Sequence, residues 1–225
     1  MGNIFLDPIK IKMMKKNIYI LTIISLLTAC KTMKSIETWT AFEAFKVVLC
    51  GVFDNKNQID TEKKAGKQVH PYAKHVTALF SEKIKNKPTD LKGYFILEES
   101  YYTYEGKPME IKPYLFYIEN VAADKIQLSS YAIPADIPKA DIRNDNPNFT
   151  LDFSKISVSK TFKPAIYTFK NGIFTVNHPT DLPNGMRFTL IETLSKNRLE
   201  VMELLEKEGK RLTPYDTPIV YERIK

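Results

Sequence analysis

The segment IYTFKNGIFTVN, residues 166–177, places Asn171-Gly172 between two runs in which apolar and polar side chains tend to alternate. Alternation with a period of two residues is typical of β-strands. Asn-Gly readily adopts the left-handed backbone of a two-residue turn, and between apolar runs it is the strongest short-range signal for a β-hairpin. The segment therefore predicts two antiparallel strands, over residues 165–170 and 173–177.

The same pattern continues on both sides of this hairpin. Further turn signals occur at Glu105-Gly106, Asn184-Gly185 and Glu208-Gly209. Besides the hairpin, the predicted strands cover residues 72–83, 93–104, 111–119, 125–132, 149–159, 186–195, 198–205 and 218–224. About ten successive antiparallel strands favour closure into a barrel. The chain is predicted to be mostly β, with a loop or short helix at 134–148 over one mouth of the barrel.

Two helices are predicted before these strands. Apolar residues recur every three or four positions over residues 35–49, with Ser35 as a candidate N-cap and Gly51 where a terminating glycine belongs. Residues 51–58 are predicted to form a polar turn. A short charged helix is expected to follow, as far as about Lys64.

The first residues have the pattern of a secretory signal peptide. A basic segment at 14–17 precedes the uncharged residues 18–29. This apolar stretch is too short to span a bilayer, which needs about 20 residues. The sequence Leu27-Thr28-Ala29-Cys30 resembles a bacterial lipobox, which predicts cleavage before Cys30 and acylation of its sulfur. The alternative is an ordinary signal peptide with a chance cysteine.

These features divide the chain into three parts. Residues 1–29 form the expected signal peptide, although residues 1–12 fit no signal sequence and suggest that translation begins at Met13 or Met14. Residues 30–36 form a lipidated tether, and residues 37–225 form the barrel domain. Lys31 resembles the sorting residue of outer-membrane lipoproteins. We therefore expect a protein of the bacterial cell envelope, anchored in the outer membrane through acylated Cys30 and facing the periplasm.

The net charge of +7 does not indicate binding to nucleic acid. Four lysines and one aspartate lie within residues 1–29, so part of the excess leaves with the signal peptide. No basic stripe or base-stacking motif accompanies the remaining charge, and we expect no nucleic-acid partner. Apart from Cys30, Cys50 is the one cysteine after the cleavage site. No disulfide framework is therefore expected.

Two adjacent carboxylates, Glu98 and Glu99, lie in the middle of the predicted strand 93–104. Successive side chains of a strand point to opposite faces, so one of the two must point into the barrel. A carboxylate there must be paired, protonated or solvated, because an isolated buried charge is very costly. It would be a ligand anchor or proton donor, or else part of an internal salt bridge. Both interpretations stay open.

Metal and hydrolase sites are not indicated. The three histidines, His70, His75 and His178, do not have the spacing of a metal-ligand set. No Gly-x-Ser-x-Gly elbow or phosphate-binding glycine loop occurs in the sequence. Adjacent carboxylates on a strand point apart and cannot flank one glycosidic bond. The sequence therefore predicts neither a metal site nor a hydrolase.

Two segments resemble the CpcT/CpeT-type chromophore (bilin) lyase family, and a third matches it in part. GVFDNKNQ, residues 51–58, is similar to its Gly-x-Phe-x-Asn-x-x-Gln signature, and FILEESYY, residues 95–102, to its aromatic-aliphatic-Glu-Gln-small strand. Pro113-Tyr114 matches the start of its Pro-Tyr-Arg-Gln-Arg stretch, but the Arg-Gln-Arg is lost. The family's later cysteine-containing segment and its C-terminal Asp-Arg-Gly and Trp-Gly pieces are also absent. The resemblance extends over residues 38–225.

The resemblance implies a lipocalin-like antiparallel β-barrel with flanking N-terminal helices, carrying a bilin or another tetrapyrrole. It implies that Glu98 is catalytic, holding the pyrrole nitrogens or protonating the bilin while a thioether forms on an acceptor protein. We expect Tyr102, Asn55 and Gln58 to contact the ligand. For Asn55 and Gln58 the alternative is a structural role at the junction of helix and barrel.

Two functions stay open. One is a chromophore lyase that binds a tetrapyrrole-like or other apolar small molecule in the barrel. The other is a non-catalytic envelope lipoprotein with a ligand-binding or interaction role, whose barrel could be filled by its own side chains. The volume of the interior separates an open barrel from a filled one.

Overall fold

The computed structural model describes residues 40–104 and 106–225. The helices are α2 (Ala41–Leu49) and α3 (Lys56–Lys64), with two 3-10 turns, η2 (Ser81–Lys83) and η3 (Phe153–Lys155). The strands are β1 (Gly51–Asp54), β2 (Tyr72–Leu79), β3 (Ile84–Lys85), β4 (Tyr94–Thr103), β5 (Glu110–Ala122), β6 (Lys125–Ala132), β7 (Leu151–Asp152), β8 (Ser157–Val158), β9 (Ala165–Lys170), β10 (Ile173–Leu182), β11 (Met186–Leu194), β12 (Arg198–Lys207), β13 (Lys210–Arg211) and β14 (Ile219–Arg223).

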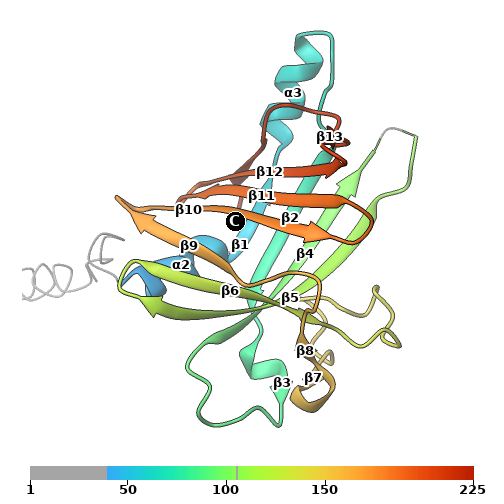
Figure 1. Cartoon of the computed structure of the whole chain (residues 1–225). Coiled ribbons are helices and arrows are strands. Elements are labelled where there is room, and N and C mark those ends of the chain that lie inside the picture. The colour runs from blue at the N-terminus through green and yellow to red at the C-terminus, as the bar shows by residue number, and fades with distance from the viewer. Residues whose placement is uncertain (1–39, 105) are drawn as a thin grey trace, which may run out of the picture. The chain divides into compact units, whose positions relative to one another are not determined.

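Ten of the described strands form a closed barrel (Figure 1). The ring runs β11-β10-β9-β6-β5-β4-β2-β1-β14-β12, and the pairing of β12 with β11 closes it. Every described pair in the ring is antiparallel. The short strands β8 and β13 pair with β6 and β12, and β3 forms a separate parallel pair with β7. The predicted mostly β fold, an antiparallel barrel with flanking N-terminal helices, is confirmed.

The hairpins follow the turn signals in the sequence. Asn171 and Gly172 have φ angles of 51° and 78°, and Asn184 and Gly185 have 61° and 69°. Positive φ at both central residues is the signature of the type I′ turn, whose twist matches that of the two strands. The predicted hairpin between β9 and β10 is thus confirmed.

The barrel wall is incomplete between β9 and β10. Among the described residues, β10 pairs with β9 over Ile173, Phe174 and Thr175, whereas its pairing with β11 continues to Leu182. One edge of β10 beyond Thr175 is therefore not paired with β9. Pro179, which has no N–H, lies in this part of the strand, as expected for proline near an unpaired edge. This seam is the opening considered below.

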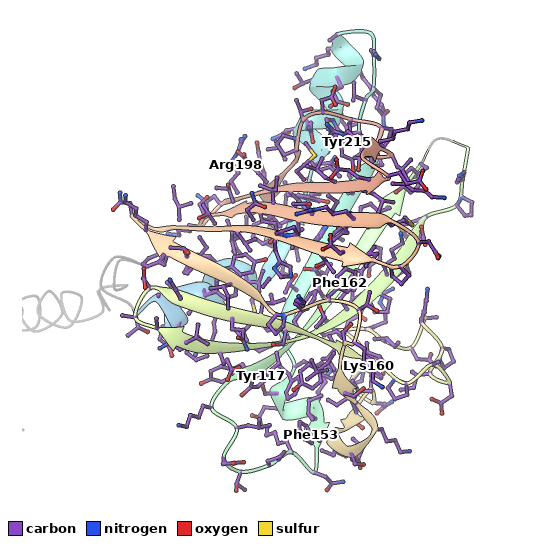
Figure 2. All side chains as sticks on the ribbon, in the orientation of Figure 1. Tyr117, Phe153, Lys160, Phe162, Arg198 and Tyr215 are labelled. Atoms are coloured by element: carbon purple, nitrogen blue, oxygen red, sulfur yellow. The ribbon has the colours of Figure 1, made fainter. Side chains whose placement is uncertain are left out.

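Strand β4 is buried on both faces. Ile96 and Tyr102 point into the cluster inside the barrel, and Phe95 and Leu97 into a second cluster outside it. Figure 2 shows Tyr117 and Phe153 in the region of this outer cluster. Burial on both faces explains why apolar and aromatic side chains occupy both faces of β4 on either side of Glu98, Glu99 and Ser100.

The segment 134–148 covers the outer cluster. Its Ile142 is 3% exposed and belongs to that cluster, and the side chain of Asn144 donates to the carbonyls of Val76 and Leu97. The prediction that this segment covers one mouth of the barrel is therefore corrected. A Pro- and Asn-rich composition predicts a loop, but it does not say which surface the loop covers.

Strand β1 corrects the prediction of a polar turn at 51–58. Gly51–Asp54 pairs with β2 and β14, so Gly51 begins a strand instead of terminating the helix. The alternation of a four-residue strand is too short to distinguish from a turn. Helix α2 begins after Thr40, whose Oγ1 accepts a hydrogen bond from Glu43 N at 3.2 Å. The predicted cap Ser35 lies outside the described residues.

The predicted strand 149–159 is also corrected, because β7, η3 and β8 divide it. Asp152 Oδ1 accepts from Ser154 N at 2.9 Å and turns the chain. Phe149, Leu151 and Ile156 all point into the outer cluster. Phe149 and Leu151 have the two-residue spacing of a strand, but Ile156 follows five residues later and reaches the same cluster because the 3-10 turn η3 lies between them.

The expected signal peptide 1–29, Cys30 and the tether 30–36 lie outside the described residues. The described helices α2 and α3 are each nine residues long. Neither has the length and apolar character that crossing a bilayer requires.

Candidate functional site

A cavity of about 420 Å³ lies inside the barrel. Small-molecule sites typically measure about 300–1,000 Å³. The apolar part of its lining includes Leu49, Phe116, Leu128, Leu190, Leu199 and Val201. Helix α2 forms the floor of the cavity. Its Leu49 lines the cavity, and the ring centre of Phe45 lies 4.9 Å from those of Tyr167 and Phe174. The barrel is therefore packed at the α2 end and open beyond it.

The segment between β8 and β9 lies across the seam beside β10. Its Ser159, Phe162 and Lys163 line the cavity, and the Phe162 ring packs 5.7 Å from that of Phe188 on β11. Figure 2 shows Lys160 and Phe162 on this segment. Phe162 is 36% exposed, so it meets both solvent and cavity. The segment between β8 and β9 therefore covers the seam and borders the cavity.

Glu98 of β4 and His75 of β2 form an ion pair in the cavity. His75 Nδ1 lies 3.2 Å from Glu98 Oε1, and Ser100 Oγ donates to the same oxygen at 2.8 Å. His75 Nε2 lies 3.0 Å from the hydroxyl of Tyr221, whose ring packs edge-on against the imidazole at 4.5 Å. His75 is therefore held in one orientation, with one nitrogen toward the carboxylate.

The pairing stabilises the charged form of each group, so it lowers the pKa of Glu98 and raises the pKa of His75. Burial disfavours the Glu98 carboxylate, but the charge of His75 and the hydrogen bonds from His75 and Ser100 outweigh it, so the pKa of Glu98 is lowered. Burial likewise disfavours charged His75, yet Glu98 raises its pKa, with smaller contributions from Glu192 and Glu203. The proton of the pair consequently resides on the imidazole.

Two further carboxylates face the cavity from the opposite wall. Glu192 lies on β11 and Glu203 on β12, and the Tyr167 hydroxyl donates to Glu192. Burial, reinforced by the charge of Glu98 and partly offset by Tyr167, raises the pKa of Glu192 to about 7. Desolvation by the surrounding walls also raises the pKa of Glu203, although the residue is exposed by its accessible area. The cavity thus concentrates three carboxylates in a space with mainly apolar walls.

Glu192→Gln is expected to change how stability depends on pH. Folded protein keeps the Glu192 proton up to about pH 7, whereas the unfolded chain releases it near the ordinary value of 4.5. The contribution of Glu192 to the free energy of unfolding is therefore fully present below about pH 4.5 and is lost as the pH rises to 7. From pH 5 to pH 8 the free energy of unfolding of the native protein should fall by about 2 kcal/mol more than that of the variant. Urea unfolding across this range measures it. Parallel profiles for the two proteins would contradict the prediction.

The structure places Glu98 and Tyr102 together on the inner face of β4, where both line the cavity. Tyr102 is 9% exposed and burial raises the pKa of its hydroxyl. Its ring lies 6.3 Å from His75, edge to face. These two predicted residues are therefore in position to contact a ligand.

Asn55 and Gln58 hold the α3 segment to the barrel. Asn55 Nδ2 donates to Pro71 O at 2.9 Å, and its Oδ1 accepts from Ala73 N at 2.8 Å. Gln58 donates to Pro218 O at 3.0 Å and accepts from Val220 N at 2.9 Å. The described residues that line the cavity do not include them. These contacts match the alternative interpretation, a structural role at the junction of helix and barrel.

Glu99 points away from the cavity into the outer cluster. It is 2% exposed and accepts hydrogen bonds from the Tyr101 hydroxyl at 2.5 Å and from Asn144 N at 2.6 Å. Its Oε2 also lies 2.7 Å from Arg143 Nε. Strand alternation therefore separates the two adjacent carboxylates, one into the cavity and one onto segment 134–148.

Sequence reasoning missed most of the polar lining, namely His75, Tyr167, Glu192 and Glu203. A signal was present, because Glu192 lies in alternation with Leu190 and Leu194 on β11. A carboxylate on an otherwise apolar strand face is unusual and marks a candidate site. Within the described part of the chain, no three His, Cys, Asp or Glu side chains are arranged to hold a metal ion.

No family model and no curated protein matches this chain. A solved structure of the CRL protein of Arabidopsis, in selenomethionine form, is similar, with a TM-score of 0.55 and 15% sequence identity. The match covers 82% of this chain and 100% of that one. At this identity the likeness shows a shared β-barrel fold alone, because one fold serves many functions.

Proposed function

We propose that this protein binds a mostly apolar small molecule in its barrel, and that the ligand is a bilin or another tetrapyrrole, as in the CpcT/CpeT-type lyases. The observation that carries the proposal is the cavity of about 420 Å³ with the Glu98–His75 pair in its wall. Binding sites for small molecules combine apolar walls with a few well-placed polar groups. A barrel filled by its own side chains would leave no such space.

Glu98 and His75 act as one unit in this proposal. The Glu98 carboxylate accepts hydrogen bonds from the N–H groups of the ligand, and a charged acceptor makes these bonds stronger than neutral ones. His75 keeps Glu98 ionised and is the nearest proton source, because its pKa is raised by the pairing. Tyr102 lines the same wall and offers its ring to the ligand.

The lyase activity is proposed from the sequence resemblance. A lyase would pass its chromophore to a cysteine of an acceptor protein through the seam between β9 and β10. The alternative is a non-catalytic lipoprotein that binds the ligand and keeps it. Mass spectrometry of a cysteine-containing acceptor after incubation with the loaded protein separates the two, because only a lyase leaves a thioether-linked chromophore.

We also propose that the protein is anchored in the outer membrane through acylated Cys30 and faces the periplasm. The lipobox at Leu27-Thr28-Ala29-Cys30 and Lys31 after it support this placement. The mass of the mature N-terminal peptide tests it, since diacylation adds two hydrocarbon chains and cleavage leaves Cys30 as the first residue.

Glu98→Gln is expected to weaken tetrapyrrole binding about tenfold, because the ligand loses a charged acceptor and keeps a neutral one. The measurement is an absorbance titration of the full-length protein with biliverdin. Glu119→Gln is the matched control, because Glu119 lies on β5 outside the cavity and pairs with Gln127. Equal affinities of native protein and Glu98→Gln would contradict the role of Glu98. A native protein that binds neither biliverdin nor haem would contradict the tetrapyrrole proposal.

A further inference from the structure

The wall formed by β11 and β12 carries two carboxylates that lack a cationic partner. Tyr167 donates a neutral hydrogen bond to Glu192. No described lysine or arginine forms an ion pair with Glu192 or Glu203. Glu98 differs from both, because His75 already neutralises it. The unmatched negative charge of the cavity is therefore localised on one wall.

The fold sets this wall opposite Glu98. Strand β4 is five positions from β11 in the ring of ten, so the two strands lie across the barrel from each other. Leu190 of β11 is paired with Glu203 on one side and with His178 on the other. Leu128, Leu190 and Val201 line the space between the polar groups. An apolar body in the cavity would thus be bordered by carboxylates from both walls.

His178 provides a second, independent sign of an unfilled polar site. Its imidazole lines the cavity from β10, and its buried Nε2 finds no hydrogen-bond partner among the described residues. His75, which is 6% exposed, also lines the cavity, but its Nδ1 faces Glu98 in the ion pair. Buried polar atoms of native proteins are nearly always paired. A polar atom of a ligand would complete His178 Nε2.

We propose that the cavity selects organic cations, molecules with an apolar body and one protonated nitrogen held between Glu192 and Glu203. This inference rests on the proposed binding of a small molecule in the barrel, but it competes with the tetrapyrrole as ligand, because the two propionates of a bilin or haem are anionic at neutral pH. A protonated nitrogen would donate charge-assisted hydrogen bonds to the two carboxylates and relieve their mutual repulsion. An organic anion would meet the charge of Glu192 and Glu203, and among the described residues of the lining Lys163 is the one lysine. A neutral ligand would leave the charge of the wall unmatched.

Three probes of the same shape test this. The full-length protein is titrated by calorimetry with 1-adamantylamine, 1-adamantanol and 1-adamantanecarboxylate at pH 7.5, which share one apolar cage and differ in charge. We expect the amine to bind about 10- to 100-fold more tightly than the alcohol, and the carboxylate most weakly. The double variant Glu192→Gln/Glu203→Gln should lose this preference while it still binds the alcohol.

Glu200→Gln is the matched control. Glu200 lies on β12 three residues before Glu203, but it points outward and pairs with Arg198 at 2.7 Å. The control should keep the preference for the amine. Glutamine has the size of glutamate, and thermal unfolding of each variant verifies that it is folded.

The outcomes separate this inference from the proposed function. Equal affinity for the three probes, or tightest binding of the carboxylate, would overturn the cation inference while confirming that the barrel binds apolar molecules. Retention of the amine preference in the double variant would also overturn it. If none of the probes binds, the inference fails, and the biliverdin titration decides separately whether the proposed function stands.

Discussion

Glu99→Ala is expected to lower the free energy of unfolding by about 3–4 kcal/mol. The carboxylate is 2% exposed, accepts hydrogen bonds from the Tyr101 hydroxyl and the Asn144 backbone N–H, and forms an ion pair with Arg143. Its removal leaves two donors without their acceptor and the Arg143 charge without its partner. Truncating one member of a buried ion pair costs this much because the remaining group stays desolvated.

The effect should concentrate on segment 134–148. Asn144 is attached to β4 through Glu99 and through the carbonyls of Val76 and Leu97. Hydrogen exchange should therefore accelerate at Asn144 and Ile142 more than in β11 or β12, and urea unfolding gives the total loss of stability.

Asp145→Asn is the control for Glu99→Ala. Asp145 lies 3.8 Å from the same guanidinium, but its side chain is 82% exposed. Exposed pairs of this kind contribute about 0–1 kcal/mol, so the control should stay close to the native protein. If Glu99→Ala costs no more than Asp145→Asn, Glu99 does not attach the segment to the barrel.

The sequence predicts the strands and turns of the barrel well where neighbouring residues determine the backbone conformation. Asn171-Gly172 and Asn184-Gly185 can adopt positive φ, and the alternating runs beside them have one buried face. Closure of the ring is different. It depends on β1, a four-residue strand that joins β2 to β14. This strand pairs with a segment far away in the chain, and the alternation of neighbouring residues does not predict such pairing.

The site was predictable in part for a related reason. Glu98 and Tyr102 share one strand face, so a period of two residues is enough to place them together. His75, Glu192 and Glu203 come from three other strands. Their positions around one cavity follow from the register of β2 against β4 and of β11 against β12. Register over such separations is set by the closed barrel and not by any one strand.

Arg223 at the end of β14 holds the C-terminus of α2. Its guanidinium donates to Cys50 O at 2.7 Å, Val48 O at 2.6 Å and Val47 O at 3.3 Å. It also donates to Lys196 O at 2.6 Å, and it lies 4.3 Å from the ring centre of Phe53. The last carbonyls of a helix have no partner within the helix and favour a cation there. The Arg223 side chain thus attaches helix α2, the floor of the cavity, to β14.

Gly51 makes room for this arrangement. A Cβ at Gly51 would lie 2.0 Å from Arg223 Nη1, and the residue has φ +149°. Gly51→Ala would therefore displace the guanidinium as well as strain the backbone. Changes at the two positions act on the same contacts and should not be additive.

Arg223→Ala is expected to lower the free energy of unfolding by about 2–3 kcal/mol and to weaken ligand binding, because α2 loses its hold on the barrel and Leu49 forms the cavity floor. Urea unfolding and the biliverdin titration measure the two effects. Arg223→Lys keeps the charge but not the planar set of donors, so it should recover less than half of the loss. Arg198→Ala, which removes an arginine paired on the surface with Glu200, should change stability by under about 1 kcal/mol. Full recovery by lysine would mean that charge alone holds the helix end, and a loss in Arg198→Ala as large as in Arg223→Ala would contradict a specific role for Arg223.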